Sequence, residues 1–130
     1  MQRIPLFLIT VAVCLHLDCT ESTQPTAKEV YVLVEVESVF QNDLVTLLLD
    51  NKTLIESRIT TNDVLSLAWS SGFMELSNDS HSLYFAVIEY GAHDSYKIDL
   101  TNDTSTVAIR FDKSTKQIHF QQFKGRLWRD

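Results

Sequence analysis

The sequence predicts an all-β protein, a single antiparallel β-sandwich of about seven strands without a disulfide. Three observations predict this fold class. Apolar residues recur at every second position through much of the chain after residue 29, the periodicity of a strand with one buried face. Asn and Asp pairs separate these segments at intervals of roughly ten residues, and both residue types suit turns. Helical periodicity is nearly absent.

Seven segments are predicted to be strands. The valines at even positions from 30 to 36 should face the core, because polar or larger residues alternate with them. Two segments, 44–49 and 83–88, are apolar on both faces, as central strands are. The other predicted strands are 54–60, 96–100, 107–111 and 117–121. The pattern resembles an immunoglobulin-like sandwich in architecture, without a motif match. If the first strand lay at a sheet edge, Tyr31 and Leu33 would favour association through strand addition.

The polar pairs between the strands are predicted turns. Five of them are Asn42-Asp43, Asp50-Asn51, Asn62-Asp63, Asn78-Asp79 and Asn102-Asp103, and two more are 91–94 and 112–115. Segment 64–77 allows two interpretations. We expect strand or irregular structure because its apolar run is short, and a helical turn through Leu65, Ala68 and Trp69 is the alternative.

The N-terminus predicts secretion. Residues 1–19 combine a basic residue, Arg3, with an apolar run that is too short to span a bilayer, as in a signal peptide. Cleavage is expected after Cys19, with Ser22 as the alternative. A lipoprotein signal is disfavoured because the acidic Asp18 precedes Cys19. Residues 20–28 are a predicted disordered leader, 29–123 the domain, and 124–130 a basic and aromatic C-terminal tail.

Cysteine content and charge exclude several functions. The only cysteines are Cys14 and Cys19, so the mature chain should have no internal disulfide, no thiol nucleophile and no Cys-based zinc site. A net charge of −6 argues against nucleic-acid binding. No second long apolar run follows the signal, so no membrane insertion is expected. Three Asn-X-Ser/Thr sequons in predicted turns indicate N-glycosylation, at Asn51, Asn78 and Asn102.

Catalytic signatures are missing from the sequence, so we expect a protein that is not an enzyme. There is no nucleophile elbow and no Gly-rich phosphate loop. The mature histidines are scattered, at positions 81, 93 and 119, and we expect no metal and no cofactor. Calcium binding by the Asn/Asp turns is the alternative, and its ligands would be Asp43, Asp63, Asp79 and Asp103.

Two aromatic features are candidate binding surfaces. Trp69 and Phe73 flank Gly72, and Arg126, Trp128 and Arg129 gather in the tail. Trp and Arg are favoured at interface hot spots. The alternatives are a core position for Trp69 and a basic tail that docks on its own acidic domain.

These observations predict a secreted, non-enzymatic binding module for an extracellular or cell-surface protein or glycan. The alternative is a carrier of a small apolar ligand in a cavity lined by Phe85, Phe111 and Phe120. A structural subunit of a larger assembly is a further possibility. The oligomeric state is left open.

Overall fold

The computed structural model describes residues 29–37 and 39–125. The predicted signal peptide, the leader and residues 126–130 of the tail lie outside these described residues. The described part forms eight strands and one short 3₁₀-helix. They are β1 (Val30–Glu37), β2 (Asp43–Leu49), β3 (Lys52–Ile59), β4 (Leu67–Leu76), β5 (Ser82–Val87), η2 (Ile88–Tyr90), β6 (Ala92–Lys97), β7 (Thr104–Asp112) and β8 (Gln117–Lys124).

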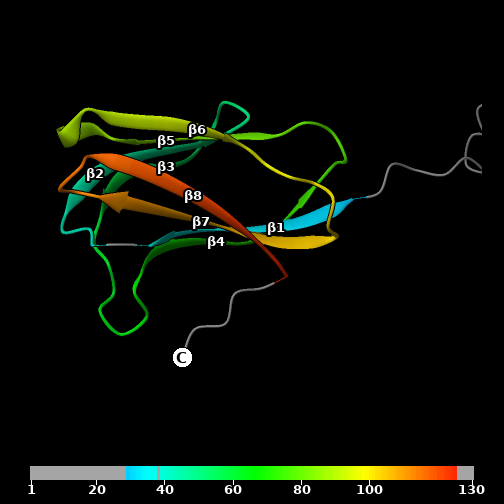
Figure 1. The fold of residues 1–130 in the computed structure, drawn as a ribbon, viewed down its shortest axis with the longest axis horizontal. Helices are drawn as coiled ribbons and strands as arrows, with labels where there is room; N and C mark the ends of the chain where they lie inside the picture. The colour runs from blue at the N-terminus through cyan, green and yellow to red at the C-terminus, as the bar shows by residue number, and fades with distance from the viewer. Residues whose placement is uncertain (1–28, 38, 126–130) are drawn as a thin grey trace, which may run out of the picture.

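The strands form two four-stranded sheets that pack face to face (Figure 1). One sheet has the order β4-β1-β7-β8 and the other has the order β3-β2-β5-β6. Most neighbours are antiparallel, but β1 and β7 are parallel. The predicted all-β sandwich is therefore confirmed. The count of seven strands is not confirmed, because the described residues form eight. The immunoglobulin-like strand order is not confirmed either. In the immunoglobulin fold the first two strands lie in the same sheet, whereas here β1 and β2 lie in different sheets.

The core lies between the sheets and contains the residues that alternate in the sequence. Val32, Val34 and Val36 are fully buried, which confirms the predicted inward face of the first strand. From the opposing sheet, Leu47 and Phe85 are equally buried. Among the described residues, no buried side-chain nitrogen or oxygen lacks a hydrogen-bond partner. The described domain therefore closes around a filled apolar layer without a disulfide.

Two neighbouring predictions, the turn at 91–94 and the strand at 96–100, were wrong. Segment 91–94 is not a turn, because the chain already reverses at η2, where Gly91 takes the left-handed φ of 64°. Strand β6 consequently begins at Ala92 and ends at Lys97, so the predicted strand 96–100 is displaced. The condition for strand addition at the first strand is not met, because β1 lies between β4 and β7 and is not an edge.

The uncertain segment 64–77 is mainly a strand. Residues 63–66 form a turn, and β4 runs through the next ten residues. The helical alternative is therefore wrong. The strand interpretation is right from Leu67 onward, and it supplies the strand that the sequence count missed.

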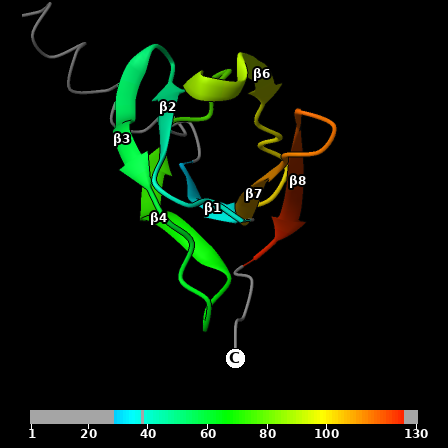
Figure 2. The same cartoon turned by 90° about the vertical axis from the view of Figure 1, so that its left-hand side faces the viewer.

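Strand connections gather at two opposite ends of the sandwich (Figure 1). We call one the apolar end, made by the loops 39–42, 60–66, 88–91 and 113–116. We call the other the sequon end, made by the connections 50–51, 77–81 and 98–103. In Figure 2 the apolar end faces the viewer. The apolar end exposes four large apolar side chains, whereas the sequon end contains the three sequons.

Candidate functional site

The apolar end carries most of the exposed apolar side chains of the described residues. Six large apolar residues are exposed there and on the sheet faces. Four belong to the apolar end, and they are Val39, Val64, Leu65 and Ile88. The other two are Tyr31 and Phe73, on the outward face of the sheet that contains β1. Four of the six therefore lie at one end of the sandwich, on three of its loops, which makes this end the candidate contact surface.

The most prominent loop at this end is the β3–β4 connection, which projects below the sandwich in Figure 1. Its base is closed because the Asn62 N–H donates to the Leu67 carbonyl at 2.9 Å. The Asn62 side-chain oxygen then accepts from the N–H groups of Val64 (2.9 Å) and Leu65 (3.1 Å). An Asn that bonds the backbone two and three residues ahead stabilises a tight turn. Both exposed aliphatic side chains are thereby held at the tip.

The β1–β2 loop is tied to this hairpin through Phe40. The Phe40 N–H donates to the Thr61 hydroxyl at 2.8 Å, and the Thr61 N–H donates to the Phe40 carbonyl at 2.9 Å. The Phe40 ring is buried, with its centroid 6.2 Å from those of both Phe85 and Phe111. Two hydrogen bonds and an aromatic anchor therefore fix the backbone beside the exposed Val39.

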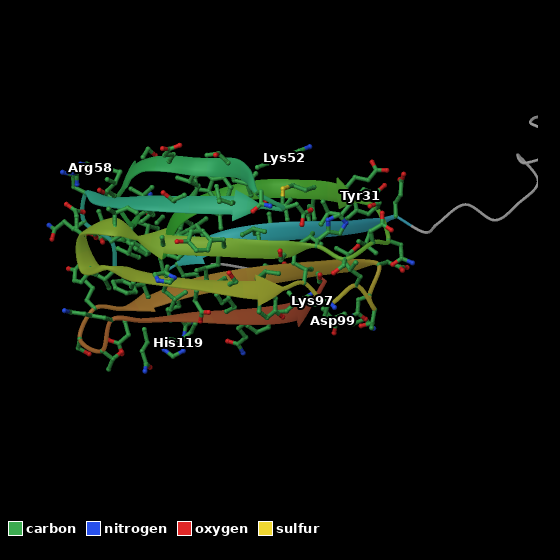
Figure 3. All side chains as sticks on the ribbon, turned by 90° about the horizontal axis from the view of Figure 1, so that it is seen from above. Tyr31, Lys52, Arg58, Lys97, Asp99 and His119 are labelled. Atoms are coloured by element: carbon green, nitrogen blue, oxygen red, sulfur yellow. The ribbon has the colours of Figure 1, made fainter. Side chains whose placement is uncertain are left out.

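Ion pairs stiffen the remaining loops. Glu89 accepts from the Leu44 N–H and from Arg58, each at 2.9 Å, and these two bonds lower the pKa of Glu89 below its usual value. The Lys113 ammonium lies 3.0 Å from Asp43 and over the Tyr90 ring. The Asp43 carboxylate raises the pKa of Lys113. Figure 3 shows Arg58 toward this end of the molecule.

A hollow of about 1180 Å³ opens between the β1–β2 loop, the β3–β4 loop and the β7–β8 turn. Val39 and Phe120 contribute apolar surface to its lining. Arg110 also lines it and donates to Glu37 at 3.0 Å, while 61% of the Arg110 side chain stays exposed. The guanidinium has five N–H donors, so it can bind Glu37 and a partner's acceptor together. The hollow therefore combines apolar surface with a charged donor.

The sequon end contains all three sequons. Asn51 forms a two-residue hairpin turn with Asp50, and both residues have left-handed φ values, of 68° and 50°. That geometry is typical of tight hairpins and suits Asn and Asp. Asn78 is exposed in the β4–β5 connection, and Asn102 is half-buried in the β6–β7 connection. Any sugar on these residues would lie far from the apolar end.

A histidine joins two of these connections. The His81 Nδ1 lies 2.5 Å from the Asp50 carboxylate, and its Nε2 lies 2.9 Å from the Ser77 carbonyl. Both ring nitrogens face acceptors, an arrangement that the doubly protonated, cationic ring satisfies at both positions. The bond to Asp50 raises the pKa of His81 above its usual value of 6.5. Partial burial opposes ionisation of Asp50, but the bonds from His81 and the Ser82 N–H outweigh it and lower the Asp50 pKa.

Ser77, His81 and Asp50 have the residue types of a nucleophilic triad. The Ser77 hydroxyl is 3.3 Å from His81 Nε2, but that nitrogen donates to the Ser77 carbonyl instead. The hydroxyl itself donates to Asp79 at 3.0 Å. A general base must have a free lone pair toward the nucleophile. The arrangement is a structural clasp between two loops, and in this state it cannot activate the serine.

The structure separates the binding residues that the sequence singled out. Trp69 is half-buried and packs against the core, whereas Phe73 is 45% exposed on the outward face of β4. Arg126, Trp128 and Arg129 lie outside the described residues. The sequence reasoning missed Val39, Val64 and Leu65, although Val64 and Leu65 directly follow a predicted Asn-Asp turn. Two aliphatic residues directly after a predicted Asn-Asp turn can therefore indicate an exposed loop tip.

The suggested calcium ligands are also separated. Asp43 and Asp63 belong to the apolar end, and Asp79 and Asp103 to the sequon end. In residues 29–37 and 39–125, no group of three or more His, Cys, Asp or Glu side chains is arranged to hold a metal ion. No helix in the same part of the chain is long and apolar enough to cross a membrane.

The sequence matches no protein-family model. It also shows no significant similarity to a curated protein sequence.

Proposed function

We propose that this chain is a secreted, non-enzymatic interaction module that binds an extracellular or cell-surface protein through its apolar end. The observation that carries the proposal is the hollow lined by Val39, between loops held by hydrogen bonds, one of which exposes Val64 and Leu65 at its tip. Rigid loops lose little conformational entropy on binding, so a small apolar surface can reach useful affinity. Loops at one end of a β-sandwich are also a common place for recognition.

A protein partner is favoured over a glycan by the kind of exposed side chain. Sugar rings stack on flat aromatic faces, whereas the exposed side chains of the apolar end are aliphatic. The exposed guanidinium of Arg110 can receive a carboxylate from the partner. We therefore expect the partner to present an apolar side chain next to an acidic group.

Secretion and glycosylation are parts of the same proposal. The N-terminal sequence supports export, and sugar on Asn51, Asn78 and Asn102 would cover only the sequon end. A bulky glycan excludes partners from the surface around it. The distribution of sequons thus leaves the apolar end open to a protein partner.

The carrier alternative gains no support from the hollow. Phe111 and Phe120 reach its lining, but Phe85, the third residue of the predicted cavity, is buried against Phe40 and does not line it. We therefore propose no carrier function.

The test is quantitative capture of partners from extracellular fluid and cell surfaces, using residues 20–130 made in glycosylating cells. The double variant Val64→Ser/Leu65→Ser removes the exposed aliphatic tip. Val64 is 81% exposed, so its substitution should change the free energy of unfolding by no more than about 0.5 kcal/mol. Tyr31→Ser is the matched control, because Tyr31 is 44% exposed but lies on a sheet face.

We expect a stoichiometric protein partner whose affinity falls at least tenfold with the double variant and is unchanged by the control. Retained binding by the double variant would contradict the proposed surface. Capture that is lost after the partner's sugars are removed would indicate a glycan ligand. A bound lipid released on denaturation would support the carrier function instead.

A further inference from the structure

A second hollow lies at the sequon end, between the β4–β5 connection and the chain that leaves β6. This open hollow has a volume of about 470 Å³, within the range of about 300–1,000 Å³ that small-molecule sites occupy. Its lining consists of two short runs of neighbouring residues, 78–80 and 97–100. The first run is the complete sequon of Asn78, so we call this surface the Asn78 hollow.

The three sequon asparagines differ in their relation to this hollow. Asn78 lines it, whereas Asn51 in the β2–β3 turn and Asn102 in the β6–β7 connection do not. Asn78 is exposed, so its side-chain amide is open to modification. A sugar joined to that amide begins at the edge of the hollow, and this holds for Asn78 but not for the other two positions.

Hydrogen bonds fix the wall opposite the sequon. The Ile98 N–H donates to the His81 carbonyl at 2.9 Å and so ties this wall to the residue that follows the sequon. Gln122 of β8 holds both backbone groups of Asp99, because its side-chain oxygen accepts from the Asp99 N–H at 2.9 Å and its side-chain nitrogen donates to the Asp99 carbonyl at 2.7 Å. A wall that is already ordered lowers the entropic cost of binding.

The lining combines apolar surface with charged groups. Leu100 is half-buried, and Lys97 and Asp99 are exposed beside it, toward the sequon end (Figure 3). The Asp99 carboxylate accepts from the Thr101 N–H at 3.0 Å, and a carboxylate has about four lone-pair sites, so it can accept from a hydroxyl group as well. An ammonium group such as that of Lys97 donates to hydroxyl or carbonyl oxygens.

These features match the first sugar of an N-linked glycan, N-acetylglucosamine. We propose that this sugar, when it is attached to Asn78, occupies the Asn78 hollow, with its acetyl methyl group on Leu100 and its polar groups bound by Lys97 and Asp99. The covalent link makes the encounter intramolecular, so even a weak contact is well populated. The inference rests on the glycosylation that is part of the proposed function, and it gives one of the three glycans a fixed position.

The test uses the protein as it is secreted from glycosylating cells, with each glycan trimmed enzymatically to its first N-acetylglucosamine. Mass spectrometry first establishes which asparagines carry the sugar. Nuclear Overhauser effects should then connect the acetyl methyl group of the sugar on Asn78 to the methyl groups of Leu100. Amide exchange at Ile98 and Asp99 should be slower by about threefold or more than in Asn78→Gln, which has no sugar at this site.

Thr53→Ala is the matched control, because it removes the sugar from Asn51, which lies at the same end but does not line the hollow. It should leave the contacts of the Asn78 sugar and the amide exchange unchanged. An Asn78 without sugar would overturn both the glycosylation proposed for this site and the placement of the sugar. A sugar on Asn78 that has no contact with Leu100 and leaves the exchange at residues 98 and 99 unchanged would overturn the placement alone, and the proposed glycosylation would stand.

Discussion

The clasp at the sequon end predicts a specific pH dependence of stability. In the His81→Phe variant a planar ring remains, but the donors to Asp50 and to the Ser77 carbonyl are lost. A hydrogen bond to a charged group contributes about 1.5–3 kcal/mol when it is shielded from water. The Asp50 side chain is 39% exposed and the His81 side chain 12%, so solvent weakens their attraction. We expect a loss of about 1–2 kcal/mol, which lowers Tm by roughly 4–16 °C in a domain of this size.

The sign of the pH effect follows from the two pKa shifts. The His81 pKa is raised in the fold, so its contribution is complete below the unfolded value of 6.5 and is lost as the pH rises through the folded value. The Asp50 pKa is lowered, so its contribution is complete above 3.8 and is lost as the pH falls through the folded value. The clasp therefore stabilises the fold most between these two reference values, from about pH 4 to pH 6.5.

Thermal unfolding followed by circular dichroism between pH 4 and pH 9 measures how much the clasp stabilises the fold at each pH. The Tm difference between the unsubstituted chain and His81→Phe should be largest near pH 5.5 and should shrink as the pH rises above 6.5. A difference that is constant across this range, or that grows toward pH 9, would refute the assignment of a cationic His81 bound to Asp50.

Three further predictions concern the loops. Phe40→Ala should lower the free energy of unfolding by about 3–5 kcal/mol in urea titrations, because it empties a buried aromatic site; a loss below about 1 kcal/mol would contradict the packing. Asn62→Ala should speed amide exchange at residues 64 and 65 at least tenfold and leave the strands unchanged, whereas unchanged exchange would show that its side chain does not hold the tip. Single Asn→Gln changes at Asn51, Asn78 and Asn102 should each reduce the mass of the secreted protein by one glycan. An unchanged mass would show that the substituted site carries no glycan.

Strand positions were readable from the sequence where the apolar pattern reflects burial directly. The valines of β1 were predicted correctly from period-two alternation, and β2 and β5 were predicted from short runs that are apolar on both faces, as suits central strands. The error at 91–94 arose because His93 and Asp94 suggest a turn by composition, whereas the reversal depends on the φ of Gly91. Local composition does not reveal which of several polar residues takes the left-handed conformation.

Strand order and the candidate site could not be derived from the sequence. The parallel pairing of β1 with β7 joins residues more than seventy positions apart, and no periodicity reports it. The apolar end depends on four loops brought together by that order, so Val39 and Val64 can be assigned to the same end only from the fold. The alternation of successive connections between the two ends follows from antiparallel geometry. It explains why the sequons, which lie in alternate connections, share one end.

The most direct test of the account is hydrogen exchange on the complex with the captured partner. Binding should protect the amides of the three loops of the apolar end that surround the hollow, in residues 39–42, 60–66 and 113–116, while the sequon end exchanges as in the free protein. Protection confined to residues 50–51, 77–81 and 98–103 would contradict the proposal that the apolar end is the binding surface.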